Sequence, residues 1–420
     1  MPADQSASGA VASLRAPDVG DEVAWVAKHL GAFASDDVRA GGIPGGQSHA
    51  DRALAAFDVA GYANRRNEVQ PVQRRGASML SPYIRHGLIS LREAWDRIAD
   101  GPSRDVESFR DELLWQEYAR HVYARLGDAT RRSMRFSVVE QDDAPRDSWP
   151  PGMDCIDASV RELREQGWIT NQQRMWLASH WAVRERWAWR DGEDEFFRHL
   201  LDGSRAANRL GWQWTSGALT GKPYGFSRWQ VEKRAPGLCA GCARKTNCPI
   251  QEWPPEEAPP ARPIVDSRMR KDPEVDSTAG PSIPHADGRT IDAVWLTAES
   301  LGDRDPALAA HPGVQAIFVF DAPLLTRLRL SGKRLVFLAQ SLADLASRRD
   351  IEVRLGDPVE ELAGLATAAT FAPVPGWGRR TQGIRPAEVH PWPWLVRPGA
   401  GPVTSFTAWR RGVGRIAHPA

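Results

Sequence analysis

Four cysteines have the spacing that most directly suggests chemistry in this sequence of 420 residues. Three lie in the segment LCAGCARKTNCPI, where Cys239 and Cys242 form a C-x-x-C pair and Cys248 follows six residues later. Cys155 lies far upstream, beside the start of a predicted helix. Four thiolates can hold zinc or an iron–sulfur cluster. Four-cysteine zinc sites usually use two local pairs, and the spacing also differs from the common ferredoxin runs. Spacing alone therefore leaves both alternatives open.

The composition is that of an ordinary globular, enzyme-sized protein, with 42% hydrophobic and 25% charged residues. The net charge of +1 gives no overall attraction to nucleic acid, although residues 198–234 are locally basic and carry several tryptophans. No apolar run reaches the roughly 18 residues of a membrane span, and the start MPADQSASGA is not a signal sequence. We therefore expect a cytoplasmic protein without membrane contact, in which metal or redox ligands are favoured over disulfides.

Hydrophobic periodicity divides the chain into segments. Residues 1–50 have weak patterning and predict a loosely ordered leader, whereas residues 51–253 show mainly helical spacing. Residues 254–289 are rich in proline and charge, as in a linker. In residues 290–415 short apolar runs such as AIFVFD alternate with amphipathic helices, which predicts a parallel sheet. The expected fold is multidomain, α and α/β: an all-helical domain followed by a small Rossmann-like parallel-sheet domain.

Several motifs follow one another along the helical region. They are YANRRN (62–67), ASMLSPYIRHGLIS (77–90), DELLWQEYARHV (111–122), GWITNQQRMWLASHW (167–181) and DGSRAANRLGWQW (202–214). In this order they resemble the FAD-binding domain of photolyases and cryptochromes. The pattern GM-x-C at 152–155, with GKPYGFSRWQ running into CAGC and NCP, resembles the iron–sulfur branch of that family. This resemblance implies a 4Fe-4S cluster, rather than zinc, on Cys155, Cys239, Cys242 and Cys248.

The resemblance also implies which residues hold FAD. Ser78, Leu80 and Ser81 would bind the phosphates through hydroxyls and backbone amides, although Ala77 replaces the usual threonine. Arg174 and Asp202 would form the ion pair beside the flavin ring, and Asn208 would face the flavin N5. The other residues of the expected cofactor pocket are Tyr62, Met79, Phe109, Gln116, Trp168, Asn171, Ser204 and Ala207. Ser204 stands where the family often has an acid.

A second set of residues falls on positions that contact the pyrimidine dimer in the repair enzymes: Glu112, Trp115, Asn171, Met175 and Trp214. Aromatic walls, a carboxyl group and an amide are what a flipped dinucleotide requires. Asn171, where the branch repairing (6-4) products has histidine, favours cyclobutane dimers. Gln116 and Gln172 stand where arginines are common, which implies fewer phosphate contacts.

Trp212 and Trp189 match two steps of the family's electron-hopping chain from the flavin to the surface. The third step is not at its usual place, because no tryptophan occurs between positions 115 and 149. Trp149, Trp187 or another aromatic residue would have to complete the route.

The domain order differs from that of the family. AVWLTAESLGDRDPALAAHP, AIFVFDAPLL and RLVFLAQSLADLASRRDIEVRLGDPVEEL resemble the family's first domain, yet they follow the helical region. Circular permutation, with the segment before residue 290 as the new connection, is the simplest explanation. Basic residues that the family places after the first strand are absent from LTAESLG, so the resemblance assigns no antenna chromophore.

The leading hypothesis is an FAD-dependent, monomeric lyase of the photolyase type, which uses light to repair pyrimidine dimers in damaged single- or double-stranded DNA. The alternative is a cryptochrome-like blue-light receptor that binds FAD and signals through a partner without repair. A further alternative is a scaffold protein without flavin, in which the cysteines bind a structural zinc ion.

Overall fold

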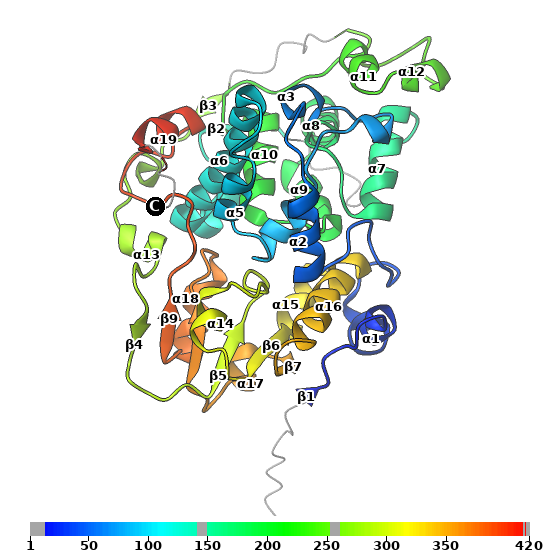
Figure 1. Ribbon diagram of the computed structural model, residues 1–420. Coiled ribbons are helices and arrows are strands. Elements are labelled where there is room, and N and C mark those ends of the chain that lie inside the picture. Colours follow the sequence, from blue (N-terminus) through cyan, green and yellow to red (C-terminus); the bar gives the residue numbers. More distant parts are fainter. Residues whose placement is uncertain (1–12, 141–148, 253–260, 415, 417–420) are drawn as a thin grey trace, which may run out of the picture.

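The computed structural model describes residues 13–140, 149–252, 261–414 and 416, with a helical domain above an α/β domain in Figure 1. The helical domain consists of α2 (Gln47–Ala56), α3 (Tyr62–Arg65), α4 (Ser81–Arg85), α5 (Leu91–Arg97), α6 (Ser103–Leu126), α7 (Asp154–Gln166), α8 (Asn171–Ser179), α9 (Trp189–His199), α10 (Arg205–Ser216), α11 (Arg228–Arg234) and α12 (Leu238–Gly241). Within the described ranges, no helix is both long and apolar enough to cross a membrane.

Local sequence signals set the ends of the helices that carry the site. A capping box begins α8, because the Thr170 hydroxyl accepts from the Gln173 amide while the Gln173 side chain accepts from the Thr170 amide. Gly217 ends α10 with a φ of 88°, a left-handed conformation that favours glycine. The longest helix, α6, crosses the middle of the domain and is buried along much of its length.

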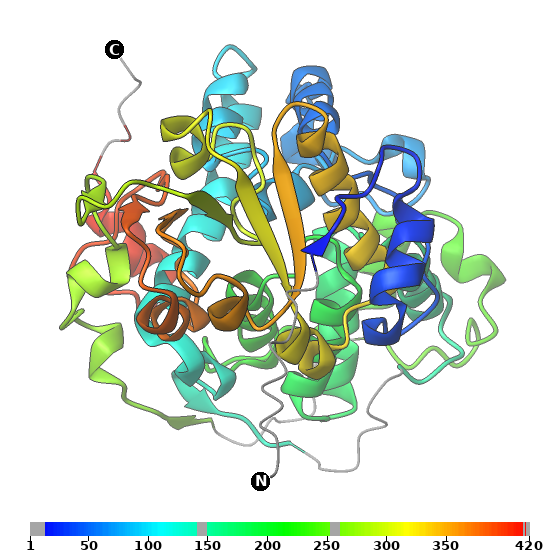
Figure 2. The same ribbon diagram turned by 90° about the horizontal axis from the view of Figure 1, so that it is seen from below.

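The α/β domain contains a seven-stranded sheet in the order β1-β7-β6-β5-β8-β9-β4, in which β1 (Ser13–Leu14) and β4 (His285–Ala286) are the edge strands. The parallel strands are β5 (Ala293–Leu296), β6 (Ala316–Asp321), β7 (Ile351–Gly356), β8 (Thr367–Thr370) and β9 (Glu388–His390). The order reverses beside β5, as in a Rossmann-type sheet. Helices flank the sheet in Figure 2: α14 (Pro306–Ala310), α15 (Ala322–Leu328), α16 (Gly332–Ala346), α17 (Pro358–Glu361) and α18 (Gly376–Ile384). The expected helical and parallel-sheet domains are confirmed.

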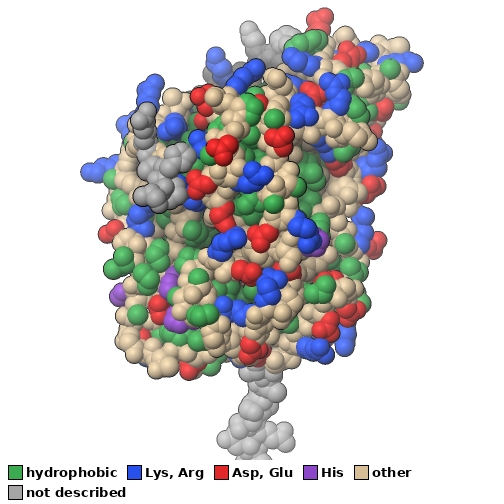
Figure 3. Space-filling model, viewed as in Figure 1, with side chains coloured by type: hydrophobic (Ala, Val, Ile, Leu, Met, Phe, Trp, Pro, Cys, Tyr) green, Lys and Arg blue, Asp and Glu red, His purple; other side chains and the backbone are tan. Residues whose placement is uncertain are grey.

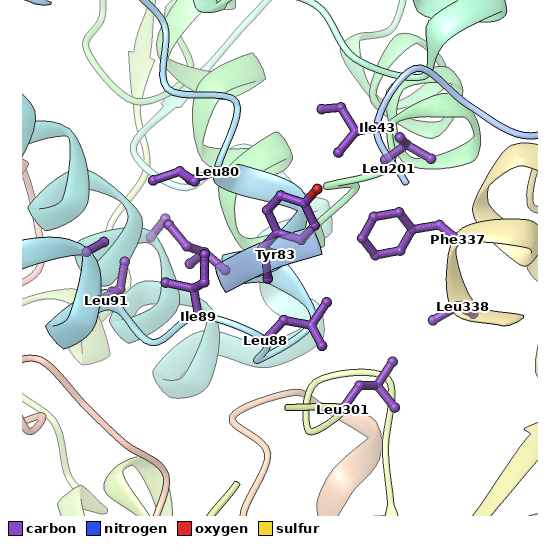
Figure 4. Packing of buried hydrophobic residues seen from close by; sticks show 14 of the residues in the cluster. Ile43, Leu80, Tyr83, Leu88, Ile89, Leu91, Leu201, Leu301, Phe337 and Leu338 are labelled. Atoms are coloured by element: carbon purple, nitrogen blue, oxygen red, sulfur yellow. The ribbon is translucent and has the colours of Figure 1, made fainter. Parts of the chain in front are cut away.

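The two domains share one hydrophobic core. Figure 4 shows Phe337 and Leu338 of α16 facing Tyr83 and Leu88 of the helical domain. The Tyr83 and Phe337 ring centroids lie 6.1 Å apart. Because α16 lies between the sheet and the helical domain, it is buried almost all round. Each fully buried large apolar side chain stabilises the folded state by about 1.5–3 kcal/mol, so this interface fixes the domains relative to each other.

The expectation of a loosely ordered leader is wrong for residues 13–50, whereas residues 1–12 lie outside the described ranges. Strand β1 (Ser13–Leu14) pairs with β7, and α1 (Glu22–Leu30) packs against α16. Asp36 accepts a hydrogen bond from the Gly332 amide at 2.7 Å and lies 3.1 Å from the fully buried Lys333 ammonium. Hydrophobic periodicity did not predict that these residues are ordered, because their partners lie far away in the sequence.

The expected linker at 254–289 is also wrong for residues 261–289. Strand β3 (Arg262–Pro263) pairs with β2 (Phe136–Ser137), and β4 (His285–Ala286) pairs with β9 at one edge of the sheet. Between them, α13 (Val275–Ala279) packs against α6. Asp272 forms a buried ion pair with Arg125 at 3.1 Å. Proline and charge thus mark an ordered connection that crosses both domains.

Candidate functional site

A cavity of about 470 Å³ opens between α3, α4, α6, α8 and α10. It brings together most of the residues predicted for the cofactor and the dimer: Tyr62, Ser78, Met79, Ser81, Phe109, Glu112, Trp115, Gln116, Trp168, Asn171, Arg174, Met175, Asp202, Ser204, Ala207, Asn208, Trp212 and Trp214. Leu80 and Trp189 do not line it. The Leu80 side chain is fully buried in the core, and its amide donates to the Ser78 hydroxyl at 3.4 Å.

Helical periodicity explains how these side chains converge. On α6 the cavity-lining residues include Phe109, Glu112 and Gln116, which lie three and four positions apart and therefore share a face. Asn171 and Arg174 do the same on α8. Each helix presents one such stripe to the cavity, and its other faces pack into the protein.

Polar groups beside the cavity are only partly satisfied by the protein. Arg174 Nη2 lies 2.8 Å from Asp202 Oδ2, and both side chains are largely buried. Asp202 Oδ1 and Asn208 Nδ2 are buried but have no hydrogen-bond partner among the described residues. A buried unsatisfied polar atom costs about 1–3 kcal/mol. A ligand that offers a donor to Asp202 and an acceptor to Asn208 would remove this cost.

Three arginines that sequence analysis did not assign also line the cavity: Arg66, Arg85 and Arg120. Arg66 Nε lies 3.4 Å from Glu112, and Arg85 Nη1 lies 2.9 Å from Glu299 of the α/β domain. All three arginines fall inside the quoted motifs, so motif position was the signal that could have identified them. Their guanidinium groups suit an anionic, phosphate-bearing ligand.

The residues predicted for the dimer form another part of the same wall. Burial raises the pKa of Glu112, while Arg66 opposes this shift. The Glu112 side chain is still 38% accessible because it faces the cavity. Trp115 stacks on Phe406 of α19 (Phe406–Gly412), with ring centroids 4.2 Å apart and planes 9° apart. Sequence analysis gave no sign of this contact, which covers one face of Trp115.

Comparison with known proteins agrees with this geometry. Residues 109–232 match the family described as the FAD binding domain of DNA photolyase. This part of the helical domain is therefore similar to the FAD-binding domain of photolyases. Deoxyribodipyrimidine photo-lyase of Synechococcus sp. is 33% identical over 193 residues, covering 42% of this chain and 38% of the relative. The enzyme of that name from Thermus thermophilus is 32% identical over 189 residues, covering 43% and 44%. The match thus spans less than half the length of these relatives.

Solved structures of related name were also found. A class III photolyase from Agrobacterium tumefaciens has a TM-score of 0.38 and 24% identity, covering 52% of this chain and 46% of that one. A Synechocystis cryptochrome has a TM-score of 0.43 and 20% identity, covering 47% and 46%.

Tryptophans of the photolyase-type domain form a buried cluster behind the cavity. Trp212 lines the cavity, and its ring centroid lies 6.5 Å from that of Trp181. Trp181 in turn lies 5.1 Å from Trp149 and 5.0 Å from Trp187. Trp189 belongs to the same cluster and is 1% exposed. Trp181, which sequence analysis did not assign, therefore links Trp212 to both residues predicted to complete the chain.

The four cysteines of the photolyase-type domain line one small cavity, so the structure brings Cys155 of α7 to the segment around α12. Burial raises the pKa of the Cys155 thiol to about 12, with smaller contributions from the other thiols.

A second cavity, of about 480 Å³, lies between the photolyase-type domain and the sheet. It is lined by the ends of β5 and β6 and by the segment after β8, close to where the strand order reverses. Ligands of open α/β sheets usually bind at such a position. Arg85 and Arg120 line both cavities. Arginines from other elements therefore supply the positive charge that the segment after β5 lacks.

Proposed function

We propose that this protein is a light-dependent flavoenzyme of the photolyase type that binds FAD and splits cyclobutane pyrimidine dimers in DNA. One observation supports this most strongly: residues expected for the cofactor and residues expected for the dimer line a single cavity. Its volume is within the range of about 300–1,000 Å³ that is usual for cofactor sites.

The donors and acceptors of the cavity fit FAD. The Asn208 amide and the free Asp202 oxygen would bind polar edges of the flavin ring, and Arg174 would hold the Asp202 carboxylate in place. The Ser78 and Ser81 hydroxyls, together with Arg66, would accommodate the phosphates. When bound and reduced, FAD would supply light-driven electron donation, and the protein would orient and tune it.

The chain's own groups would hold the dimer against the cofactor. Trp115 and Trp214 offer aromatic surfaces for stacking, and the Asn171 amide can hydrogen-bond a pyrimidine edge. The Glu112 carboxyl group, whose pKa is raised by burial, lines the same wall and can hydrogen-bond a pyrimidine edge. Met175 Sδ lies 3.9 Å from the Asn171 amide nitrogen, so both side chains reach the same point.

The cysteine site supports a 4Fe-4S cluster. The donor set is four thiols that line one cavity, and four cysteine thiolates are the ligands of such a cluster. A cationic centre would reverse the effect of burial on Cys155 by stabilising its thiolate. We infer a structural or electron-storage role, because the described cavity around the cysteines is separate from the cavity that Asn208 lines.

Trp212, Trp181 and the half-buried Trp187 form the route that we infer for reduction of the flavin. The indole rings follow one another from the cavity wall outward. Trp149 offers a branch from Trp181 but is 5% exposed, so it is a less direct exit to solvent.

We also infer that the domain order arose by circular permutation. The photolyase-type domain comes first in the chain, and the sheet with its Rossmann-type strand order comes second. Residues 261–289 form the connection, and residues 13–50 close the far side by packing on α16.

A repair assay tests the proposed enzyme. Reduced protein is illuminated with blue light in the presence of single- or double-stranded oligonucleotides that contain one cyclobutane dimer, with dark samples as controls. We expect light-dependent loss of the dimer, and a substantial decrease in repair in the Glu112→Gln variant at unchanged flavin content.

A cryptochrome-like receptor is the second candidate. The stacking of Phe406 on Trp115 favours it, because one face of an indole expected to contact the dimer is already covered. If the flavin photoreduces while both DNA forms stay unrepaired, the receptor function replaces the repair function.

A further inference from the structure

A group of three side chains lies in the α/β domain, away from the cavities described above. His311 follows α14, and Glu388 and His390 belong to β9. One ligand atom from each residue lies within 4.8 Å of the other two. Glu388 lies between the histidines: one carboxylate oxygen is 3.1 Å from His311 Nε2, and the other is 2.8 Å from His390 Nε2. Figure 3 shows histidine side chains at the surface on the side of β4 and β9.

The three side chains are largely buried but retain some access to solvent. Those of His311, Glu388 and His390 are 20%, 16% and 4% accessible. His390 Nε2 is buried and lies 2.8 Å from one Glu388 carboxylate oxygen. The Glu388 carboxylate therefore has an imidazole nitrogen close to each of its oxygens. A cation among the three side chains could bind both imidazoles and the carboxylate.

The surrounding structure holds the group rigidly. The Arg349 guanidinium donates to the backbone carbonyls of Leu308 and His311, which fixes the end of α14. At the other end of this helix, Asp305 accepts from the amides of Ala307 and Leu308 and from the Thr370 hydroxyl. Thr370 is the β8 residue that pairs with His390. The helix and β9 are thus both attached to β8, so the ligand positions are set by secondary structure.

We propose that His311, Glu388 and His390 bind a Zn²⁺ ion that joins α14 to the edge of the sheet. Two imidazoles and a carboxylate are ligands that zinc accepts, with bonds of about 2.0–2.2 Å. Tetrahedral donors at that bond length lie about 3.4 Å apart, so the nitrogen–oxygen distances of 2.8 and 3.1 Å would lengthen slightly when the ion binds. Three protein ligands leave one position for water. The site holds β9, the strand to which the connecting strand β4 is paired.

The test uses the full-length protein, stripped with a chelator that spares the cysteine site and titrated with Zn²⁺. Since the thiols are a competing site, X-ray absorption at the zinc edge identifies the ligands. We expect a nitrogen and oxygen shell at about 2.0–2.1 Å without a sulfur shell at about 2.3 Å. We also expect Zn²⁺ to raise the Tm.

His311→Ala and the milder Glu388→Gln should each weaken zinc affinity by at least about 100-fold, since loss of a supporting residue alone costs 10–100-fold. His285→Ala, an exposed histidine on β4, is the matched control and should bind like the parent protein. If His311→Ala does not fold, Glu388→Gln decides the result. A sulfur shell only, or unchanged affinity in a folded Glu388→Gln variant, overturns the proposal.

Discussion

The Arg174–Asp202 ion pair offers a sharp test of the cofactor site. In the Arg174→Met variant the Asp202 carboxylate, 5% accessible, loses the cation 2.8 Å away. In the free protein, water in the cavity can solvate this carboxylate, but bound FAD displaces that water. The free-energy cost of the unpaired Asp202 carboxylate should therefore lower the affinity for FAD more than it lowers the stability of the free protein.

Removing one partner of a buried pair costs about 3–5 kcal/mol. Because Arg174 is 21% accessible, the lower value applies, and about 3 kcal/mol corresponds to a roughly 100-fold increase in the Kd for FAD. The double variant Arg174→Met with Asp202→Asn removes the uncompensated charge, so we expect its Kd within about tenfold of the parent value.

The assay is titration of flavin-free protein with FAD, followed by flavin fluorescence or calorimetry. Arg161→Met, on an exposed position of α7, is the matched control and should leave the Kd unchanged. Two results would contradict this role of the ion pair in FAD binding. One is a change of less than threefold in the Kd for FAD in Arg174→Met, and the other is weaker FAD binding by the double variant than by Arg174→Met alone.

Further predictions concern the tryptophans, the cysteines and acid stability. Trp181→Phe should slow flavin photoreduction in a transient-absorption experiment by at least about tenfold, because a phenyl ring is harder to oxidise than an indole, whereas exposed Trp229→Phe should have no effect. Cys239→Ala should abolish the broad visible absorbance of an iron–sulfur cluster and reduce soluble yield; a soluble variant with an unchanged spectrum would contradict the cluster. Burial lowers the pKa of His86 to about 3. Since the unfolded chain then binds a proton that the folded chain does not, the free energy of unfolding should fall by up to about 1.4 kcal/mol per pH unit as the pH decreases below about 6.5. His86→Gln should make this dependence shallower in denaturant titrations, and an identical slope would show that His86 is not the group responsible.

Hydrophobic periodicity predicted the two domain types, and the resemblance of ordered motifs to a known family indicated most of the residues that line the cavity. The sequence also predicted the cysteine group, although Cys155 is distant in the chain. What it missed depends on tertiary contact. Trp181 lies between Trp212 and Trp187 only when the π-helical turn His180–Arg184, which follows α8, packs against α10.

The sequence did not predict that residues 13–50 and 261–289 are ordered, again because their order depends on tertiary contacts. Asp36 meets Lys333, and Arg125 meets Asp272, across separations that periodicity cannot detect. His311 is likewise separated by 77 residues from Glu388 and gives no local motif.

The flavin content of the purified protein tests the central claim most directly. The protein is prepared without oxygen and is then unfolded with denaturant. The pigment that it releases is quantified by absorbance and chromatography. We predict close to one FAD per chain, either as isolated or after incubation with FAD. Absence of flavin from folded protein after that incubation would contradict the assignment of the cavity.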